Sequence, residues 1–423
     1  MIANPSRRIL AMAKKGRHGG MGRHGGMGRH GGMPLLFIVF VFVACATASG
    51  MHTDTIVRQI GPKDSLLLAN PDGSILLSKN ADLQRMPAST LKILTALAAI
   101  HYLGENFCFK TDFYLDKDIN LVIKGYGDPF MVSERVSSIS GRLAEKISSV
   151  KDIIIDDTFV AQPVLVPGAD TNSLQPYDSP NGALCVNFNT VYYKTRQGKY
   201  VSAEAQTPLL PMVMQRIEKS GEKAGRILLT TDEGQAARYA GEMFAFFLAQ
   251  KGVKISGRVR TGRVNPASSR LIYTACSPPL AGIIQKIFKF SNNFMANQVL
   301  LATGARVYGK PATIKKGVRA ISEYAAKILF IHPTIIEGSG ISRTNQISPS
   351  MFLKVLERFE PYHGLMKHEG RIFYKTGTLS DVRNMAGYIR GKSGLYPFVI
   401  FINTPDKTTD AIIKKLEKLV PVN

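Results

Sequence analysis

The chain has 423 residues, of which 54 are lysine or arginine and 31 are aspartate or glutamate, so its formal charge at pH 7 is +23. This length allows two or three domains, and a hydrophobic fraction of 45% is typical of a folded globular protein. No apolar run reaches the length of a membrane-spanning helix. The positive charge favours an anionic neighbourhood, but no nucleic-acid-binding motif accompanies it, so we expect no nucleic-acid partner.

Residues 1–48 are interpreted as a leader segment that directs export. Seven basic and no acidic side chains lie in it, an apolar run covers 35–44, and Ala46–Ala48 matches an A-x-A cleavage pattern. Cys45 offers the alternative of a lipidated cysteine, which would add a peripheral membrane association. The repeat GRHGGM occurs three times in 16–33, and its histidines more simply belong to an unstructured leader than to a metal site. We therefore expect an exported protein of the periplasm or cell envelope.

The first elements after the leader are a hairpin and a helix. Two β-rich runs within 65–80 flank Asn70-Pro71-Asp72-Gly73, which is a turn signal. The apolar spacing of 86–100 predicts a buried helix, with Pro87 at or just before its first position. We assign 49–115 to the first part of the main domain.

The middle of the chain, 116–234, is rich in β-strand patterns and loops, and one helix is predicted within it at 133–149. We interpret this stretch as one or more inserted domains. Their number is not indicated by the sequence.

The remaining residues, 235–423, are predicted to complete the main domain. Helices are expected at 236–252, 280–305, 312–329 and 348–359, followed by antiparallel strands at 371–379, 384–390 and 396–404 and a closing amphipathic helix at 408–420. Because strands lie at both ends of the chain, we predict an α/β fold. Its antiparallel sheet is built from both ends and flanked by helices, with a helical region and a β-rich insertion.

Three cysteines follow the leader, Cys108, Cys185 and Cys276. They are far apart, odd in number and without a C-x-x-C pair, which argues against a zinc site or a disulfide framework. One disulfide could form, with buried free thiols as the default. The sequence calls for no metal and no organic cofactor.

Three short motifs carry the chemistry. Ser89 and Lys92 form S-x-x-K, residues 291–293 form S-x-N, and residues 375–377 form K-T-G on a predicted strand. Together and in this order they are the signature of serine acyltransferases that act on D-alanyl peptides or β-lactams. Alone, each has a simpler interpretation: a solvated lysine, a helix cap or an exposed turn.

The residue types suit nucleophilic catalysis. The hydroxyl of Ser89 needs a base, and Lys92 can act as one if burial, Lys375 and the positive end of its helix lower its pKa. Ser291 can relay the proton to the leaving amine, and Asn293 can hold Lys92 and the substrate amide.

The K-T-G motif is expected to bind substrate. Lys375, Thr376 and Thr378 can hold a carboxylate through charge-assisted hydrogen bonds, and Gly377 leaves room for a peptide along the strand edge. The backbone N–H groups of Ser89 and Thr378 can form an oxyanion hole.

With these motifs, the chain resembles the D-alanyl-D-alanine carboxypeptidase/endopeptidase branch of the low-molecular-mass penicillin-binding proteins over nearly the whole exported length. Further segments share the resemblance: GDPF with SERV, NGALCVNFNTV, SPPLAGIIQKIFKFSNNFMANQVLL, EGSGISR and NMAGYI. The resemblance implies a transpeptidase-like domain interrupted after the nucleophile helix. It also assigns the nucleophile, base, relay and carboxylate-binding roles to Ser89, Lys92, Ser291, Asn293, Lys375 and Thr376. Asn292 replaces the aspartate of the S-D-N form, which leaves both functional side chains of that motif in place.

The resemblance implies a serine peptidase that removes the terminal D-alanine from peptidoglycan stem peptides through an acyl-serine, and that β-lactam antibiotics inhibit. Some relatives also cleave cross-links. A serine β-lactamase shares the motifs, but no deacylating glutamate can be placed and the insertion is long. An idle cell-wall-binding protein would not need all the catalytic side chains. Oligomeric state and the diamino acid of the stem peptide are not indicated.

Overall fold

The computed structural model describes residues 53–422 except 231 and 233. The predicted leader at 1–48, with its cleavage site, its repeat and Cys45, lies outside the described residues.

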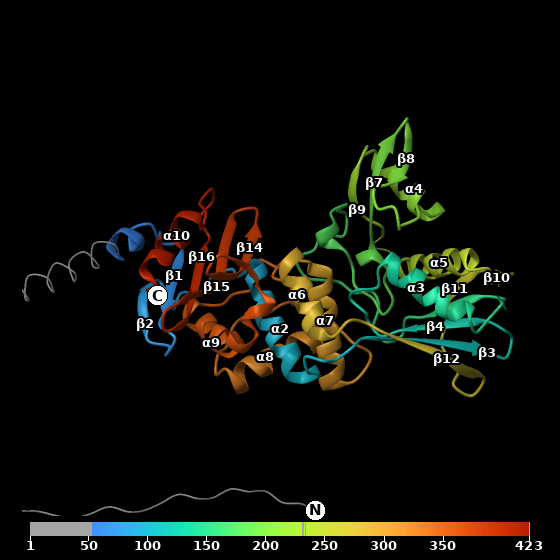
Figure 1. Ribbon diagram of the computed structural model, residues 1–423, viewed down its shortest axis with the longest axis horizontal. Coiled ribbons are helices and arrows are strands. Elements are labelled where there is room, and N and C mark those ends of the chain that lie inside the picture. The colour runs from blue at the N-terminus through green and yellow to red at the C-terminus, as the bar shows by residue number, and fades with distance from the viewer. Residues whose placement is uncertain (1–52, 231, 233, 423) are drawn as a thin grey trace, which may run out of the picture. The chain divides into compact units, whose positions relative to one another are not determined.

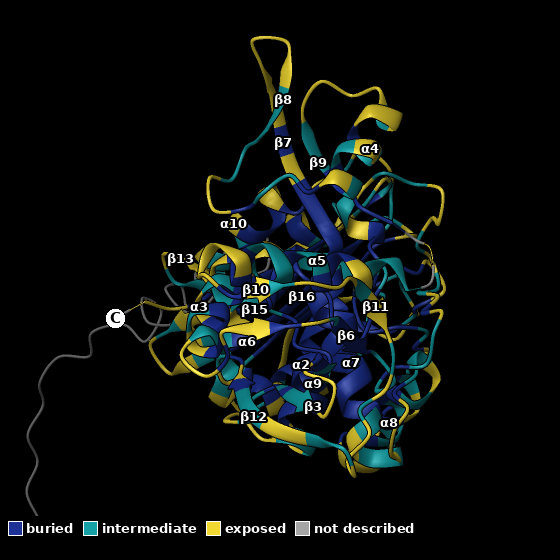
Figure 2. Ribbon diagram, turned by 90° about the vertical axis from the view of Figure 1, so that its right-hand side faces the viewer, coloured by how far each residue is buried: buried dark blue, intermediate teal, exposed yellow. Residues whose placement is uncertain are grey.

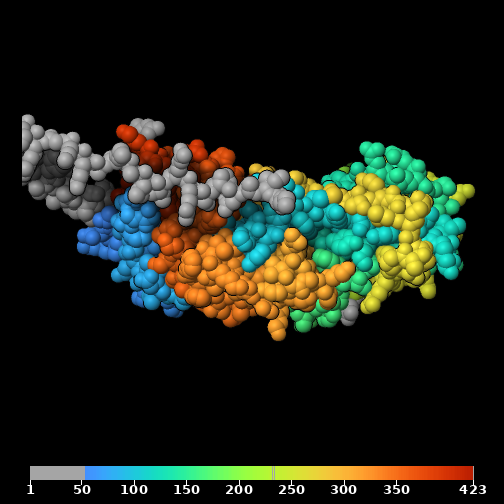
Figure 3. Space-filling view, turned by 90° about the horizontal axis from the view of Figure 1, so that it is seen from below, coloured from blue at the N-terminus to red at the C-terminus, as the bar shows by residue number. Residues whose placement is uncertain are grey.

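The main sheet has six strands in the order β13-β14-β15-β16-β1-β2, and every neighbouring pair is antiparallel. Ser65 lies opposite Phe401, so a strand from the beginning of the described chain pairs with one near its end. Figures 1 and 3 show this as blue segments beside red and orange ones. The predicted α/β fold with a sheet built from both ends is confirmed. The strands are Ser65–Ala69 (β1), Ile75–Lys79 (β2), Lys367–Glu369 (β13), Ile372–Leu379 (β14), Val382–Gly391 (β15) and Gly394–Ile402 (β16).

Each face of this sheet packs on a separate hydrophobic core, because successive side chains of a strand point to opposite faces. Leu66 and Leu68 face a core with α10 (Asp410–Leu419), whereas Leu67 and Ala69 face the larger core with the other helices of the main domain. Those elements are Ala88–Leu91 (η1, a 3-10 turn), Lys92–Leu103 (α2), Leu280–Phe290 (α6), Asn293–Tyr308 (α7), Ile314–Ile328 (α8), Pro349–Phe359 (α9) and Glu360–Leu365 (η4, 3-10).

The inserted module contains a five-stranded sheet in the order β11-β6-β4-β3-β12, a three-stranded sheet in the order β8-β7-β9 and a short parallel pair, β10-β5. One hydrophobic core joins the two larger sheets with α3, α4 and α5. In Figure 2 the tip of the β7–β8 hairpin is exposed, whereas the base of β7 is buried in this core. The elements are Lys110–Asp116 (β3), Leu121–Gly125 (β4), Ser133–Ala144 (α3), Ser149–Val150 (β5), Ile153–Asp156 (β6), Pro176–Asp178 (η2), Asn187–Asn189 (η3), Thr190–Arg196 (β7), Lys199–Ser202 (β8), Pro211–Ser220 (α4), Gly225–Leu228 (β9), Gln235–Gln250 (α5), Lys254–Ile255 (β10), Val259–Thr261 (β11) and Ser269–Cys276 (β12).

The limits of the inserted module differ from the expected 116–234. β3 begins at Lys110 and β12 ends at Cys276, and these two strands pair with each other in the module's sheet. The helix α5, expected in the second part of the main domain, packs Phe244 against Phe113 of this sheet. Parallel pairing of β11 with β6 requires a crossover connection, and α5 supplies it. The chain therefore passes between the two parts at about residues 109 and 277.

Among the described residues, no helix combines the length and the apolar composition that crossing a bilayer requires.

Candidate active site

Ser89 lies in the short 3-10 turn η1, one turn before α2 begins at Lys92. The sequence predicted it inside the α-helix itself. Thr90 closes the turn with a hydrogen bond from its hydroxyl to the Pro87 carbonyl, 2.6 Å. Because residues three apart eclipse in a 3-10 turn, the Lys92 Nζ comes to 2.7 Å from the Ser89 Oγ.

Lys92 is 1% exposed, and its Nζ meets three acceptors. It donates to the Ser89 Oγ, to the Asn293 Oδ1 at 2.7 Å and to the Ser339 carbonyl at 2.6 Å. An ammonium group has three protons for these three partners. A neutral amine would keep the bonds to Asn293 and Ser339 and turn its lone pair to the Ser89 hydroxyl, which is the arrangement of a general base.

Burial makes the neutral form of both site lysines more accessible. It lowers the pKa of Lys92 well below its usual range, and the charge of Lys375 lowers it further, whereas the Glu337 carboxylate acts in the opposite sense. The pKa of Lys375 is lowered to about 7, first by burial and then by the charge of Lys367.

Ser291 and the residues after it occupy the junction between α6 and α7. Ser291 ends α6 in a left-handed conformation, with φ of 53°, and the Lys375 Nζ donates to its Oγ at 2.8 Å. The Asn292 side chain accepts from the Met295 N–H at 2.9 Å and so caps α7. Asn292, which stands where the S-D-N form has Asp, therefore caps the start of α7. Asn293 is the first residue of α7 and reaches Lys92.

The K-T-G segment lies on β14. Lys375 is buried and also donates to the Thr376 carbonyl at 2.6 Å. Thr376 and Thr378 are exposed on the same face of the strand. β13 pairs only with residues 372–374, so within the described chain the rest of this edge of β14 carries no neighbouring strand.

Two glycines let other segments approach the Ser89 turn. A side-chain Cβ at Gly377 would lie 2.7 Å from the Pro87 carbonyl oxygen and 3.2 Å from the Ser89 N. A Cβ at Gly340 would lie 1.9 Å from the Ala88 carbonyl oxygen. The space beside the Gly377 Cα, expected to accommodate a bound peptide, is filled by the Ser89 turn.

Sequence reasoning missed Glu337 and the loop that it organises. This fully buried carboxylate accepts from the backbone N–H groups of Ser339 and Gly340, both at 2.6 Å, and from the side chains of Asn345 and Asn297. The loop thereby presents the Ser339 carbonyl to Lys92. The glycines of EGSG predict turns, and the glutamate that precedes them is the one sequence signal of this loop.

The inserted module also reaches the site. The Asn293 Nδ2 donates to the Tyr177 carbonyl in η2 at 3.2 Å. Gly168 of the inserted module lies close to Ser342: a Cβ added to Gly168 would lie 2.6 Å from the Ser342 Cα.

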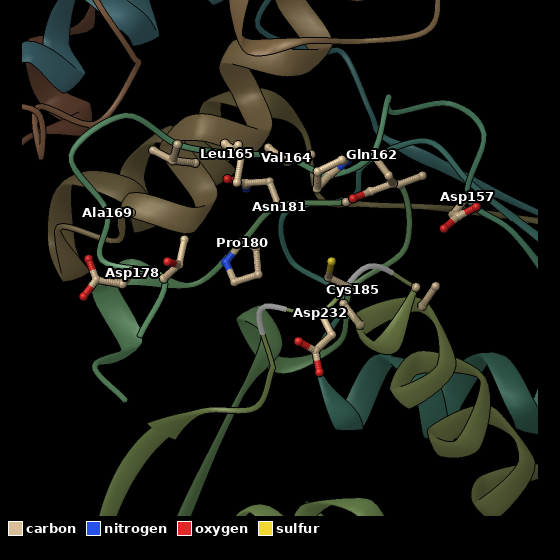
Figure 4. A pocket seen from close by; sticks show the side chains of 18 of the residues that line it. Asp157, Gln162, Val164, Leu165, Ala169, Asp178, Pro180, Asn181, Cys185 and Asp232 are labelled. Carbon is tan, nitrogen blue, oxygen red and sulfur yellow. The ribbon is translucent and has the colours of Figure 1, made fainter. Parts of the chain in front are cut away.

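A cavity of about 290 Å³ is lined by parts of the segments 162–169 and 178–185, and none of the predicted site residues lines it. Figure 4 shows Asp157, Asp178 and Asp232 around it on separate segments, with Pro180 and Cys185 between. The described residues contain no group of three or more His, Cys, Asp or Glu side chains arranged to hold a metal ion.

A buried lysine hydrogen-bonded to a serine hydroxyl, with a second buried lysine on β14, is the arrangement expected of a serine acyltransferase on a transpeptidase-like fold. The model of the D-Ala-D-Ala carboxypeptidase 3 (S13) family matches residues 67–226 and 222–364. The chain belongs to this family, and it is a serine peptidase that acts as a D-Ala-D-Ala carboxypeptidase.

Individual relatives agree with this assignment. The chain is 25% identical over 396 residues to the D-alanyl-D-alanine carboxypeptidase DacB of Haemophilus influenzae, covering 78% of this chain and 82% of the relative. It is 25% identical over 435 residues to the D-alanyl-D-alanine carboxypeptidase of Actinomadura sp. strain R39, covering 81% and 79%. The crystal structure of penicillin-binding protein 4 from Haemophilus influenzae superimposes with a TM-score of 0.70 at 21% identity, covering 86% of this chain and 97% of that one.

Proposed function

We propose that Ser89 is the nucleophile and Lys92 its general base. The observation that carries the proposal is the position of the buried Lys92 Nζ, 2.7 Å from the Ser89 Oγ, in surroundings that lower the lysine's pKa. A neutral Lys92 takes the hydroxyl proton while the Ser89 Oγ attacks the carbonyl carbon of the penultimate D-alanine.

The proton then passes to the leaving amine. The Ser291 hydroxyl, which accepts a hydrogen bond from Lys375, relays the proton from Lys92 to the nitrogen of the terminal D-alanine. The N–H groups of Ser89 and Thr378 stabilise the oxyanion. D-Alanine leaves, and water hydrolyses the acyl-serine.

Substrate binds along the open edge of β14, where an extended peptide can add as a further strand. Protonated Lys375, with the hydroxyls of Thr376 and Thr378, binds the terminal carboxylate. Asn293 binds both the Lys92 amino group and the substrate amide. Gly377 allows this strand to lie against the nucleophile turn.

The substrates are peptidoglycan stem peptides in the cell envelope, and peptide cross-links are a second substrate of the same site. β-Lactams acylate Ser89, because their carboxylate and strained amide fit the same groups. The Haemophilus influenzae relative has been solved with a β-lactam bound, which supports this part of the proposal.

Labelling with fluorescent penicillin tests the nucleophile. The wild type and Ser256→Ala, which alters an exposed serine of the inserted module, should form a persistent covalent adduct, and Ser89→Ala should form none while retaining its circular dichroism spectrum. A Ser89→Ala protein that is acylated at the wild-type rate would refute the assignment. Rapid loss of the adduct with antibiotic turnover would instead indicate a β-lactamase.

A further inference from the structure

The two passages of the chain between the main domain and the inserted module run side by side. The outgoing segment before β3 and the returning segment after β12 are joined by backbone hydrogen bonds. The Ser277 N–H donates to the Phe109 carbonyl at 2.9 Å, Leu280 to Phe107 at 2.8 Å, and Ala281 to Glu105 at 3.0 Å. Cys108 and Cys276 lie within this junction.

The strand register puts the two cysteines on the same face. Cys276 pairs with Lys110, so Cys108, two residues before Lys110, occupies the diagonal position. Regular pairing already loosens here, since the Phe109 N–H bonds the Ser277 hydroxyl rather than its carbonyl.

Both thiols are free in the structure, and they differ in access. The pKa of the Cys108 thiol is raised, first by burial and then by a hydrogen bond to the Cys276 thiol. Cys276 is exposed and Cys108 half-buried. The Cys276 backbone is held in place by Arg135, whose guanidinium donates to its carbonyl at 2.8 Å.

We propose that Cys108 and Cys276 form a disulfide that covalently joins the two passages between the main domain and the inserted module. Neither the motifs nor the peptidase reaction involves these cysteines. The third described cysteine, Cys185, is buried, and burial raises the pKa of its thiol to about 12, which makes it a poor nucleophile and a matched control.

Disulfide exchange with a small or protein disulfide supplies the oxidant. The Cys276 thiolate attacks one sulfur of that disulfide, forming a mixed disulfide and releasing one thiolate. The Cys108 thiolate then attacks the Cys276 sulfur and releases the second thiolate. The two protons lost by the cysteines pass to the two departing thiolates, and the oxidant takes up the two electrons.

The disulfide would hold the two segments of the junction together and so restrict the start of the segment that leads into α6. The returning segment leads directly into α6, which Ser291 follows as the C-cap. The bond closes a loop that contains the whole inserted module, and long closed loops restrict the unfolded chain most. The oxidised protein should therefore melt several degrees above the reduced one.

The test uses the full-length purified protein, reduced, desalted and then incubated over a range of ratios of reduced to oxidised glutathione. Free thiols are alkylated and the trypsin digest is analysed by mass spectrometry. Cys108 lies in the tryptic peptide 93–110 and Cys276 in 271–286, whereas Cys45 and Cys185 lie in separate peptides. We expect 93–110 linked to 271–286, with the loss of two free thiols per chain.

Variants separate this pair from other oxidation. Cys185→Ser should keep both the linked peptide and the rise in melting temperature, and Cys108→Ser and Cys276→Ser should each lose both. Mixed disulfides with glutathione alone at every ratio, or a link to Cys45 or Cys185, would overturn the proposal. The peptide map of the wild type decides the matter even if a serine variant folds poorly.

Discussion

Lys92 and Lys375 lie close enough for the charge of one to lower the pKa of the other. Two ammonium groups in one buried site repel each other, so the arrangement favours one charged and one neutral lysine. Lys92 donates to Ser89, the proposed nucleophile, and Lys375 donates to Ser291 from the K-T-G strand. The division of labour that follows is a neutral base at Lys92 and a charged carboxylate ligand at Lys375.

This division predicts a bell-shaped dependence of kcat/KM on pH. Activity should rise with pH as Lys92 loses its proton, because only the neutral amine can act as base. It should fall as Lys375 loses its proton near pH 7 in the free enzyme. The measurement is kcat/KM for a D-alanyl-D-alanine peptide across pH 5–10.

Lys367 gives this prediction a specific control. Its charge contributes to the low pKa of Lys375, and its side chain is exposed. Lys367→Gln should therefore move the falling limb to higher pH and leave the rising limb in place. A falling limb that stays where it was would mean that another group titrates there.

Removal of the carboxylate ligand should weaken substrate binding. Lys375→Ala loses a charge-assisted hydrogen bond, and we expect kcat/KM for carboxylate-bearing peptides to fall about 10- to 100-fold. Kinetics with a peptide amidated at its C-terminus provide the comparison, because that substrate has no carboxylate to lose. Equal losses for both substrates would remove Lys375 from carboxylate binding.

Glu337 is a positioning residue, since it acts on Lys92 through Ser339. Glu337→Gln would put an amide N–H₂ group against backbone N–H donors and should cost about 3 kcal/mol of unfolding free energy. It also removes a negative charge that favours protonated Lys92, so the rising limb of kcat/KM should move to lower pH. Urea unfolding and the pH profile measure the two effects. If Glu337→Gln lowers the unfolding free energy but the rising limb of kcat/KM does not move, Glu337 has a structural role only.

At the scale of elements, the site depends on three segments meeting at the Ser89 turn. β14 approaches it through Gly377, the loop after Glu337 through Gly340, and α7 through Asn293. Ala88 within the turn has a φ of 45°, an unfavourable value for alanine. The surrounding segments hold the turn in this conformation, which keeps the Ser89 hydroxyl on Lys92.

Gly340→Ala should disrupt this meeting. The new Cβ would collide with the Ala88 carbonyl oxygen, and Gly340 has a φ of 82°, which disfavours any side chain. We expect the rate of penicillin acylation to fall by at least 100-fold, because small displacements of reacting groups have effects of this size. Gly364→Ala, where the Cβ would meet no atom within 4 Å, should acylate at the wild-type rate. Normal acylation of Gly340→Ala would show that the turn tolerates displacement.

At the scale of the whole molecule, sequence patterns predicted the strands, the turns and the S-x-x-K contact, which depend on residues close together in the chain. The apolar run within 396–404 and the Asn70–Gly73 turn predicted strands of the sheet, and the S-x-x-K spacing predicted that Lys92 meets Ser89. The place of α5 in the inserted module could not be read locally, because a helix has the same apolar period whichever core it packs against. Glu337 was missed for a related reason: its partners are backbone N–H groups and side chains of its own loop and of α7, and these contacts leave no periodic pattern in a single sequence.

The inserted module is connected to the catalytic helix α7 by a pair of buried hydrogen bonds. The Gln298 Nε2 donates to the Gly182 carbonyl at 2.9 Å, and its Oε1 accepts from the Gly182 N–H at 3.3 Å. Five residues earlier on α7, Asn293 meets both Lys92 and the Tyr177 carbonyl. The segment 177–182 thus contacts the catalytic helix at two points.

Gln298→Ala should show whether this connection matters for the reaction. Loss of both bonds leaves two backbone groups of Gly182 without these partners, at a cost of about 1–3 kcal/mol of unfolding free energy. With the segment released, Asn293 is less firmly held, so kcat should fall while the carboxylate site at Lys375 keeps KM close to the wild-type value. Gln250→Ala, at an exposed position of α5, controls for the substitution itself. A Gln298→Ala enzyme with reduced stability but unchanged kcat would show that the module stabilises the fold without positioning the catalytic residues.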